Sequence, residues 1–267
     1  MGEGSKTFTI HSYLIANQSR VLEVLINGSL KEANERQVVW KDVEVDTFLH
    51  FCQFIYTGDY IAIRPPDENE GSEPVNLEDI QESIDRDLTL KDQTDGESDI
   101  KSAWSGLNPH YDWSNSKWCD LWDKFKDLRP QVKQGLNLRK NSNELTSSAA
   151  LHPHARIYIF ADCYGIQDLQ DRALNKLHDA LSIYELGPLI FTDKLAALVR
   201  YVYANTVADD ISQNKLREMV VIFLGRHVRL LWKDLLFRDL IDEDGEFCRD
   251  LMKLVMEWTD SASLVSL

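Results

Sequence analysis

The chain lacks the features that mark secreted and membrane-spanning proteins. Its 267 residues include four cysteines, and no two of them have a CxxC spacing: Cys52, Cys119, Cys163 and Cys248. A disulfide scaffold is therefore not expected, because such scaffolds need several paired cysteines. No apolar run reaches the ~18 residues that a membrane span needs, and none follows Met1 as in a signal peptide. We expect a protein of the cytoplasm or nucleus, not secreted and without a membrane partner.

Catalytic and metal-binding patterns are also missing. The twelve glycines form neither G-x-G-x-x-G nor G-x-x-x-x-G-K, and no serine stands in G-x-S-x-G. His152-x-His154 with Cys163 has no second ligand pair, so we interpret it as an exposed helix start and not as a zinc site. We expect no catalytic residue, no metal and no cofactor. An enzyme of an unrecognised class is the third alternative, and it would need a deep pocket of titratable groups.

Basic charge is scarce, which speaks against a nucleic-acid partner. The net charge is −15, and residues 65–100 alone hold thirteen acidic residues against Arg86 and Lys91. That segment begins with Pro65-Pro66 and has few aromatic residues, so it cannot bury enough apolar surface to offset its ordering entropy. We expect it to be mostly disordered, with at most a weak helix at 77–90. Attraction of a basic partner is the alternative to a simply solvated loop.

The first sixty residues combine two expected strands with short helices. Residues 7–11 alternate apolar and polar, and residues 37–41 have strand-like composition. Ser19 is placed to cap a helix, and Gly28 is expected to end it in the left-handed conformation. The next helix ends at Thr57-Gly58. Its core-facing residues are Phe48, Phe51, Cys52 and Ile55, at helical spacing.

Residues 101–130 contain four of the seven tryptophans. One interpretation is an amphipathic helix that docks into a partner's groove, since tryptophan is enriched among binding hot spots. The other is a helix that folds back onto its own domain, which we favour because tryptophan stripes usually belong to a core. Trp104 and Trp113 fit the helical period less well and suit exposed anchors better. The candidate partner-binding residues are Trp104, Trp113, Trp118, Trp122 and Phe125.

From Leu151 onwards the apolar spacing predicts helices almost to the end. A first helix over 154–164 ends at Gly165, and its partner carries Leu169, Ala173 and Leu177. Further helices are expected over 193–205, 215–231, 235–241 and 247–258. The chain is therefore predicted to be mostly helical.

The N-terminal pattern resembles the BTB (POZ) interaction domain. The resemblance rests on the order of an F-x-x-H strand, a serine before a short helix, a small-residue turn with a glutamate, and an aromatic-Tyr-Thr-Gly ending. It covers residues 7–60. It resumes at Arg156–Ile166, which resembles the R-V-Y-x-x-A-D-K-Y-x-I hairpin of fungal-type BTB proteins. The signature residues, which the resemblance implies to be structural, are Phe8, His11, Leu14, Ser19, Gly28, Glu32, Phe48, Tyr56, Thr57, Gly58, Tyr60, Tyr158, Ala161, Asp162 and Tyr164.

The resemblance implies an α+β, mostly helical fold, with a short sheet flanked by helical hairpins. Residues 6–64 and 151–185 would form the BTB/POZ-like core. Residues 65–150 would be an insertion, divided into an acidic part (65–100), a Trp-rich part (101–130) and a linker (131–150). Residues 186–267 would form a helical C-terminal extension.

The implied function is protein–protein interaction without catalysis. Members of the family commonly present partners to cullin scaffolds of ubiquitin ligases, through segments that correspond here to 48–60 and 151–166. The alternative is an oligomerisation scaffold in nuclear or transcriptional regulation. A homodimer is also implied, although the family's first strand is not expected in residues 1–7, which leaves a sheet edge unpaired.

Overall fold

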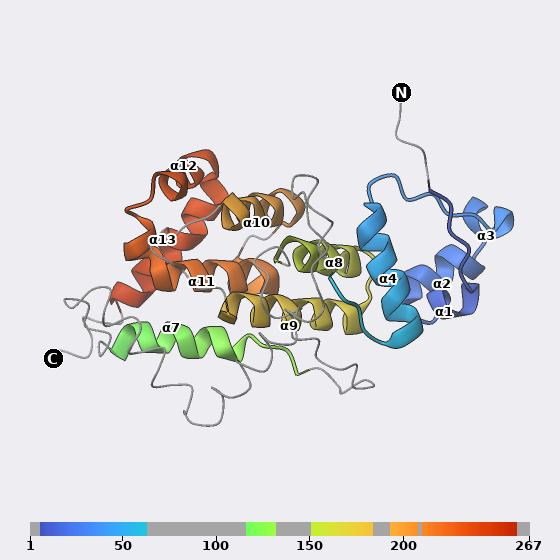
Figure 1. Ribbon diagram of the computed structural model, residues 1–267, viewed down its shortest axis with the longest axis horizontal. Coiled ribbons are helices and arrows are strands. Elements are labelled where there is room, and N and C mark those ends of the chain that lie inside the picture. Colours follow the sequence, from blue (N-terminus) through green and yellow to red (C-terminus); the bar gives the residue numbers. More distant parts are fainter. Residues whose placement is uncertain (1–5, 63–115, 132–150, 184–192, 208–209, 261–267) are drawn as a thin grey trace, which may run out of the picture. The chain divides into compact units, whose positions relative to one another are not determined.

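The computed structural model describes residues 6–62, 116–131, 151–183, 193–207 and 210–260 (Figure 1). Contacts divide the chain into two compact units, Met1–Ile63 with Asp120–Leu267, and Arg64–Cys119. The described part is mostly helical, as predicted. The acidic segment, its expected weak helix, Trp104 and Trp113 all lie outside the described residues.

Four helices form the N-terminal part: α1 (Ser12–Ala16), α2 (Arg20–Asn27), α3 (Lys31–Glu35) and α4 (Val45–Thr57). The Ser19 hydroxyl accepts a hydrogen bond from the Leu22 amide at 3.1 Å, which confirms the predicted cap of α2. Helix α4 ends at Gly58, whose φ of 77° lies in the left-handed region that glycine tolerates. Phe51 and Phe54 are among the buried residues of α4.

The two expected strands do not form within residues 6–62. In place of backbone pairing, both segments are held by aromatic contacts with α4. The Phe8 and Trp40 rings lie 5.3 Å and 4.8 Å from the Phe48 ring. An apolar pattern alone does not make a strand, because a strand also needs a neighbouring strand to accept its backbone hydrogen bonds. The short sheet of the predicted fold is accordingly absent from the part of the chain described here.

Gly28 ends α2 for a reason other than the predicted one. Its φ of −76° and ψ of −164° are extended, not left-handed. A Cβ at this position would lie 2.2 Å from the Val24 carbonyl oxygen, closer than real atoms approach. Gly28 is therefore required by close backbone approach and not by positive φ.

Helices α8 (Leu151–Cys163) and α9 (Gln167–Ile183) form a hairpin, joined by three residues at Gly165, whose φ is 65°. The hairpin was predicted from apolar spacing, and the structure confirms it. The two helices lie side by side, and α4 contacts α8 at one end (Figure 1). The ring of Phe51 lies 5.1 Å from the ring of Phe160, in the interior between α4 and α8.

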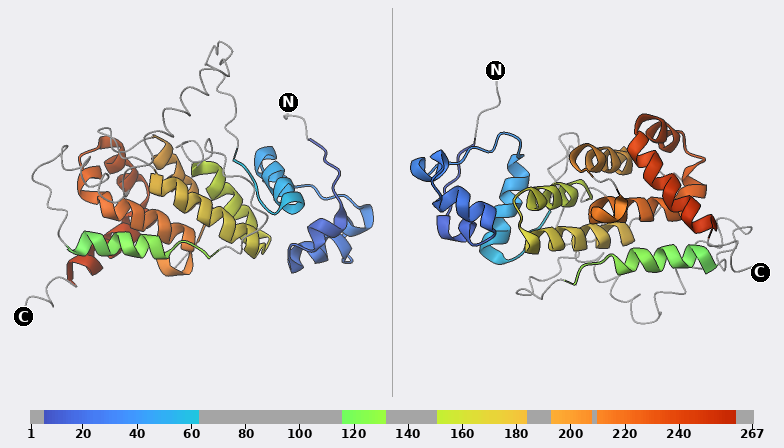
Figure 2. Two further views of the ribbon diagram at one scale, coloured as in Figure 1. Left: turned by 60° about the horizontal axis from the view of Figure 1, so that its bottom comes forward. Right: turned by 180° about the vertical axis from the view of Figure 1, so that it is seen from behind.

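The C-terminal part contains α10 (Asp193–Asn205), a short 3-10 turn η3 (Ile211–Gln213), α11 (Lys215–Leu231), α12 (Leu235–Glu243) and α13 (Gly245–Asp260). The predicted helices at 193–205 and 215–231 have the observed bounds, and the last two are each longer than predicted. Helix α11 contacts α9, α10 and α13 (Figure 2). A Cβ at Gly225 would lie 2.6 Å from Leu254 Cδ2, so α13 packs directly on the backbone of α11 there.

Helix α7 (Ser116–Asp127) is the helix predicted at the tryptophan stripe. From Leu121 onwards it packs on α9 and α11, through the ring of Phe125.

Candidate functional site

The N-terminal helices leave apolar side chains in solvent. Helix α2 buries only Leu22, although Val21 and Val24 stand one turn apart on the same side of it. These two side chains, which we call the α2 face, are 51% and 49% exposed. Tyr13 on α1 is also exposed, as is Leu30 before α3. An exposed apolar helix face that is not covered by its own domain is a feature of protein-binding surfaces.

Helix α4 is tied to the segment before α1 by two signature residues. The His11 ring Nδ1 lies 2.7 Å from the Tyr56 hydroxyl oxygen, and the rings meet edge to face. Both residues are exposed, and His11 stands at the start of α1. Leu49, about two turns earlier on α4, is also exposed (45%). The solvent-facing side of α4 thus offers Leu49 and Tyr56, which we call the α4 face.

The segment after α4 is anchored to the hairpin by a buried hydrogen bond. The Tyr60 hydroxyl and His154 Nδ1 are 2.9 Å apart, and Tyr60 is fully buried. His154 is 4% exposed, so the expected exposed helix start is wrong at this residue. Burial, reinforced by the Lys176 ammonium, lowers the pKa of His154 to about 3. His154 is therefore a neutral interior side chain at physiological pH.

A second link joins α2 to the hairpin. The Ser19 hydroxyl, besides capping α2, donates to the Tyr164 carbonyl oxygen at 2.6 Å. The Tyr164 ring lies 5.9 Å from the ring of Trp40. Arg156 on α8 forms an ion pair with Glu44, which precedes α4. Contacts from three separate N-terminal segments thus converge on α8 and its turn.

The remaining signature residues have local structural surroundings. The Thr57 hydroxyl lies 2.8 Å from the Gln53 carbonyl oxygen, and Asp162 accepts a hydrogen bond from Gln170 at 2.8 Å. Burial raises the pKa of Tyr158 to about 12. Four other signature residues belong to helices: Leu14 to α1, Glu32 to α3, Phe48 to α4 and Ala161 to α8. Gly58 directly follows α4.

The tryptophan stripe lies against its own domain where its side chains are described. Phe125 is 1% exposed, and its ring stacks on His178 with centroids 4.4 Å apart. The Trp122 ring is half-buried, and the Arg226 guanidinium carbon lies 4.0 Å from its centroid. Trp118 belongs to α7, but its side chain is outside the described residues. Phe125 is thus an interior residue of this fold, in agreement with the favoured interpretation.

A buried charged network in the C-terminal helices was not anticipated. The Arg217 side chain on α11 is fully buried; its Nε donates to Thr206 Oγ1 at 2.7 Å and its Nη1 to Glu246 Oε2 at 2.7 Å. The guanidinium also lies over the Tyr203 ring, 4.3 Å from its centroid. Tyr203 donates to Asp250 at 3.0 Å, and burial together with that carboxylate raises the pKa of Tyr203.

The available sequence signal for this network was a charged residue inside an apolar stripe. Arg217 shares a helix face with Val220, Val221 and Leu224, all of which are buried. A cation on such a face is expected to find an acidic partner, because an unpaired buried charge is costly. The network joins α10, α11 and α13 in the interior of the C-terminal part.

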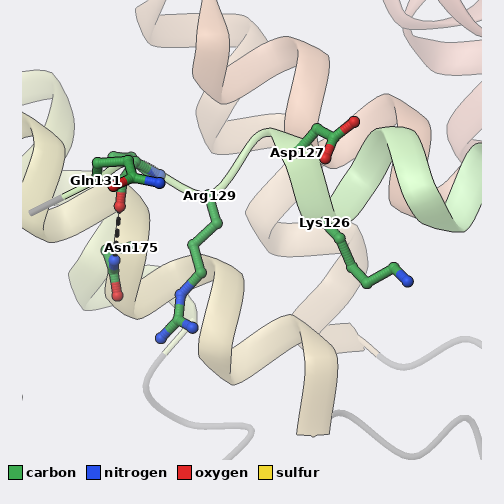
Figure 3. Close-up of a pocket in the computed structure, with 6 residues that line it drawn as sticks. Lys126, Asp127, Arg129, Gln131 and Asn175 are labelled. Carbon is green, nitrogen blue, oxygen red and sulfur yellow. Dashed lines mark hydrogen bonds between the residues drawn. The ribbon is translucent and has the colours of Figure 1, made fainter.

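The end of α7 borders a shallow hollow of about 390 Å³ (Figure 3). It is lined by Lys126, Asp127, Arg129, Pro130, Gln131 and Asn175. The charged side chains of Lys126, Asp127 and Arg129 point in different directions, so they do not form a common site (Figure 3). The Asn175 amide donates to the Pro130 carbonyl oxygen at 3.0 Å, which fixes the chain after α7 on α9.

Cys163 is exposed, whereas burial raises the pKa of the Cys52 thiol to about 11. None of the described helices combines the length and apolar character that crossing a membrane requires. Nowhere in the described ranges do three or more His, Cys, Asp or Glu side chains gather as metal ligands would.

The model of the BTB/POZ domain family matches residues 1–69. The match covers α1 to α4 and confirms the resemblance drawn from that part of the sequence. The family is one of non-catalytic protein–protein interaction domains. Neither a curated protein nor a solved structure matches the chain.

Proposed function

We propose that this protein is a non-catalytic adaptor, which binds a cullin-type ubiquitin-ligase scaffold through its BTB/POZ part. The observation that carries the proposal is that the family match coincides with helices whose apolar side chains remain exposed. On this proposal the α4 face, Leu49 and Tyr56, contributes to the scaffold contact together with the exposed side of α8. The binding energy would come from a few apolar anchors that become buried, as in other protein interfaces.

We further propose that the α8–α9 hairpin closes a BTB-like domain of the fungal type. Three contacts support this proposal: Tyr60 with His154, Phe51 with Phe160, and Ser19 with Tyr164. On this basis the domain comprises 6–64 and 151–185, with 65–150 as an insertion and 186–267 as an extension. The extension or the Trp-rich helix would then select the protein that is presented to the ligase.

The second candidate function is a homo-oligomeric scaffold without ubiquitin-ligase coupling. The α2 face favours it, since Val21 and Val24 lie on a different helix from the α4 face and could meet their equivalents in a second copy. Under this alternative the chain would act in nuclear or transcriptional regulation by bringing bound partners together.

A pull-down with a panel of purified cullin N-terminal domains separates the two candidates. The full chain should retain a cullin, Leu49→Lys should lose it, and Val24→Lys should keep it. Both substitutions place one lysine on an exposed apolar site, so each is the matched control of the other. No retained cullin, combined with a dimer on sizing chromatography that Val24→Lys dissociates, would reject the adaptor and support the scaffold.

A further inference from the structure

Helix α7 sits on its own domain in the way that a helical ligand sits in a groove. Its interior side is formed by Leu121 and Phe125, which are 2% and 1% exposed, with Trp122 beside them. The surface beneath comes from two other helices, with His178 on α9 and Phe223 on α11 touching the Phe125 ring. Apolar anchors one turn apart on one helix, received by two neighbouring helices, are the geometry of helix-in-groove recognition.

Polar contacts fix the register and direction of α7. The Phe125 carbonyl oxygen accepts a hydrogen bond from His178 Nε2 at 3.1 Å. Two residues beyond the helix, Arg129 pairs with Asp179 at 2.9 Å. At the other edge the Arg226 guanidinium covers the Trp122 ring, a cation–π contact. The surface therefore contacts four positions of the segment. They are an apolar residue at 121, an aromatic residue at 122, a second aromatic residue at 125 and a cation at 129.

The covalent chain alone does not hold α7 in this place. Residues 63–115 separate it from the described N-terminal part, and residues 132–150 separate it from α8. Nineteen residues can span up to about 65 Å when extended, far more than a neighbouring helix requires. By contrast, three residues join α8 to α9. The position of α7 thus depends on the contacts of a few anchor side chains. A competing helix with the same anchors can make those contacts in its place.

We propose that the α9–α11 surface under α7 is a binding groove for a partner helix that carries this pattern, and that α7 is its built-in competitor. The partner is an amphipathic helix with the apolar–aromatic pair, the second aromatic and the cation at the spacing of Leu121, Trp122, Phe125 and Arg129. A ligand tethered beside its own groove competes at an effective concentration on the order of millimolar, so α7 sets a threshold that the partner must exceed. The site lies on α9 of the hairpin and α11 of the C-terminal part, and it does not involve the α4 face.

The test measures binding of a labelled peptide of residues 116–131 to the full chain by fluorescence anisotropy. Phe125→Ala in the chain removes the main anchor of the competitor while leaving the groove intact, so this variant should bind the peptide at least about tenfold more tightly than the unaltered chain. Asp127→Ala, an exposed position on α7, is the matched control and should bind as the unaltered chain does. A peptide carrying Phe125→Ala should not bind.

Equal affinity of the unaltered chain and a folded Phe125→Ala variant, or no binding to that variant, would overturn the proposal. If the variant does not fold, hydrogen exchange of residues 116–131 in the unaltered chain replaces it; excess peptide should accelerate that exchange, and an unchanged rate would also overturn the proposal. Dissociation of a dimer by the peptide would overturn the assignment to a foreign helix, because α7 would then be exchanged between two copies. The assay contains no cullin, so its result is independent of the adaptor proposal.

Discussion

Helices α2 and α11 show two uses of an apolar helix in one chain. Helix α11 buries eleven residues and contacts helices on several sides, whereas α2 buries only Leu22 and leaves the α2 face in water. A helix surrounded by its own domain gains its stability from that burial. A helix that is apolar but exposed gains little from its own fold, so its apolar side chains are available to another protein. On the proposed functions, the difference separates the part of the chain that holds the structure from a part that binds another protein.

The largest expected effect tests the buried side of this contrast. Arg217→Ala should lower the free energy of unfolding by about 3–5 kcal/mol, because it removes a fully buried cation and leaves Thr206 and the buried Asp250 carboxylate without that partner. Urea denaturation followed by circular dichroism measures the loss. Arg238→Ala on the exposed side of α12 is the control, with an expected change within about 0.5 kcal/mol. A similar small change for Arg217→Ala would mean that the C-terminal interior does not depend on the network.

The next effect concerns the contact between the segment after α4 and the α8–α9 hairpin, and it depends on pH. His154 has a folded pKa of about 3, below its unfolded value, so the unfolded state binds the extra proton as pH falls. The stability due to neutral His154 is therefore complete above about pH 6.5 and falls by up to about 1.4 kcal/mol per pH unit below it. His154→Gln, which cannot titrate, should remove that part of the slope in urea titrations between pH 6.5 and 4.5.

Tyr60→Phe separates burial from hydrogen bonding in the same titration. It removes the hydroxyl that meets His154 but keeps the histidine in the interior. The pH slope should therefore stay as in the unaltered chain, while the free energy of unfolding falls by about 1 kcal/mol at every pH. A slope that disappears in Tyr60→Phe would show that burial is not what lowers the pKa of His154.

An effect of comparable size is expected at the link between α2 and the hairpin. Ser19→Ala removes both the cap of α2 and the hydrogen bond to the Tyr164 carbonyl, which should cost about 1–2 kcal/mol of unfolding free energy. Ser12→Ala is the matched control, since Ser12 is exposed at the start of α1. Equal melting temperatures for the two variants would indicate that α2 is not held by the hairpin.

The smallest effect on stability is expected on the α2 face. Val24→Ser should change the free energy of unfolding by no more than about 0.5 kcal/mol, because Val24 is already half exposed. Leu22→Ser, two residues away but fully buried, should be strongly destabilising in the same urea measurement. If Val24→Ser were as harmful as Leu22→Ser, the α2 face would belong to the core and the contrast with α11 would not hold.

The sequence predicted helices better than strands for a physical reason. The residues of α11 satisfy their backbone hydrogen bonds within the helix, so apolar spacing alone located its ends at Lys215 and Leu231. Residues 7–11 and 37–41 carry a strand pattern, but strands depend on a partner that composition does not identify. Their aromatic residues Phe8 and Trp40 contact Phe48 instead, although Phe8 stays 40% exposed.

Buried polar residues were the least predictable. Nothing near His154 in the sequence shows that Tyr60, ninety-four positions earlier, shares a hydrogen bond with it. Arg217 likewise meets Glu246 and Asp250, which belong to another helix. Burial of such groups depends on tertiary neighbours, whereas the apolar face of a helix can be read locally. The exposed Val21 and Val24 pose the converse problem, because apolar character alone does not show which side chains of a short helix stay in solvent.

The absence of a side chain at Gly225 determines how closely two helices approach. Leu254 fills the space that a Cβ would need, so any larger residue would force Leu254 aside or move α13 outward. Asp250 stands one turn before Leu254 on α13, and Arg217 stands about two turns before Gly225 on α11. An alanine at 225 can therefore act at a distance: an outward movement of α13 would carry Asp250 away from the Tyr203 hydroxyl, although the substitution removes no polar atom.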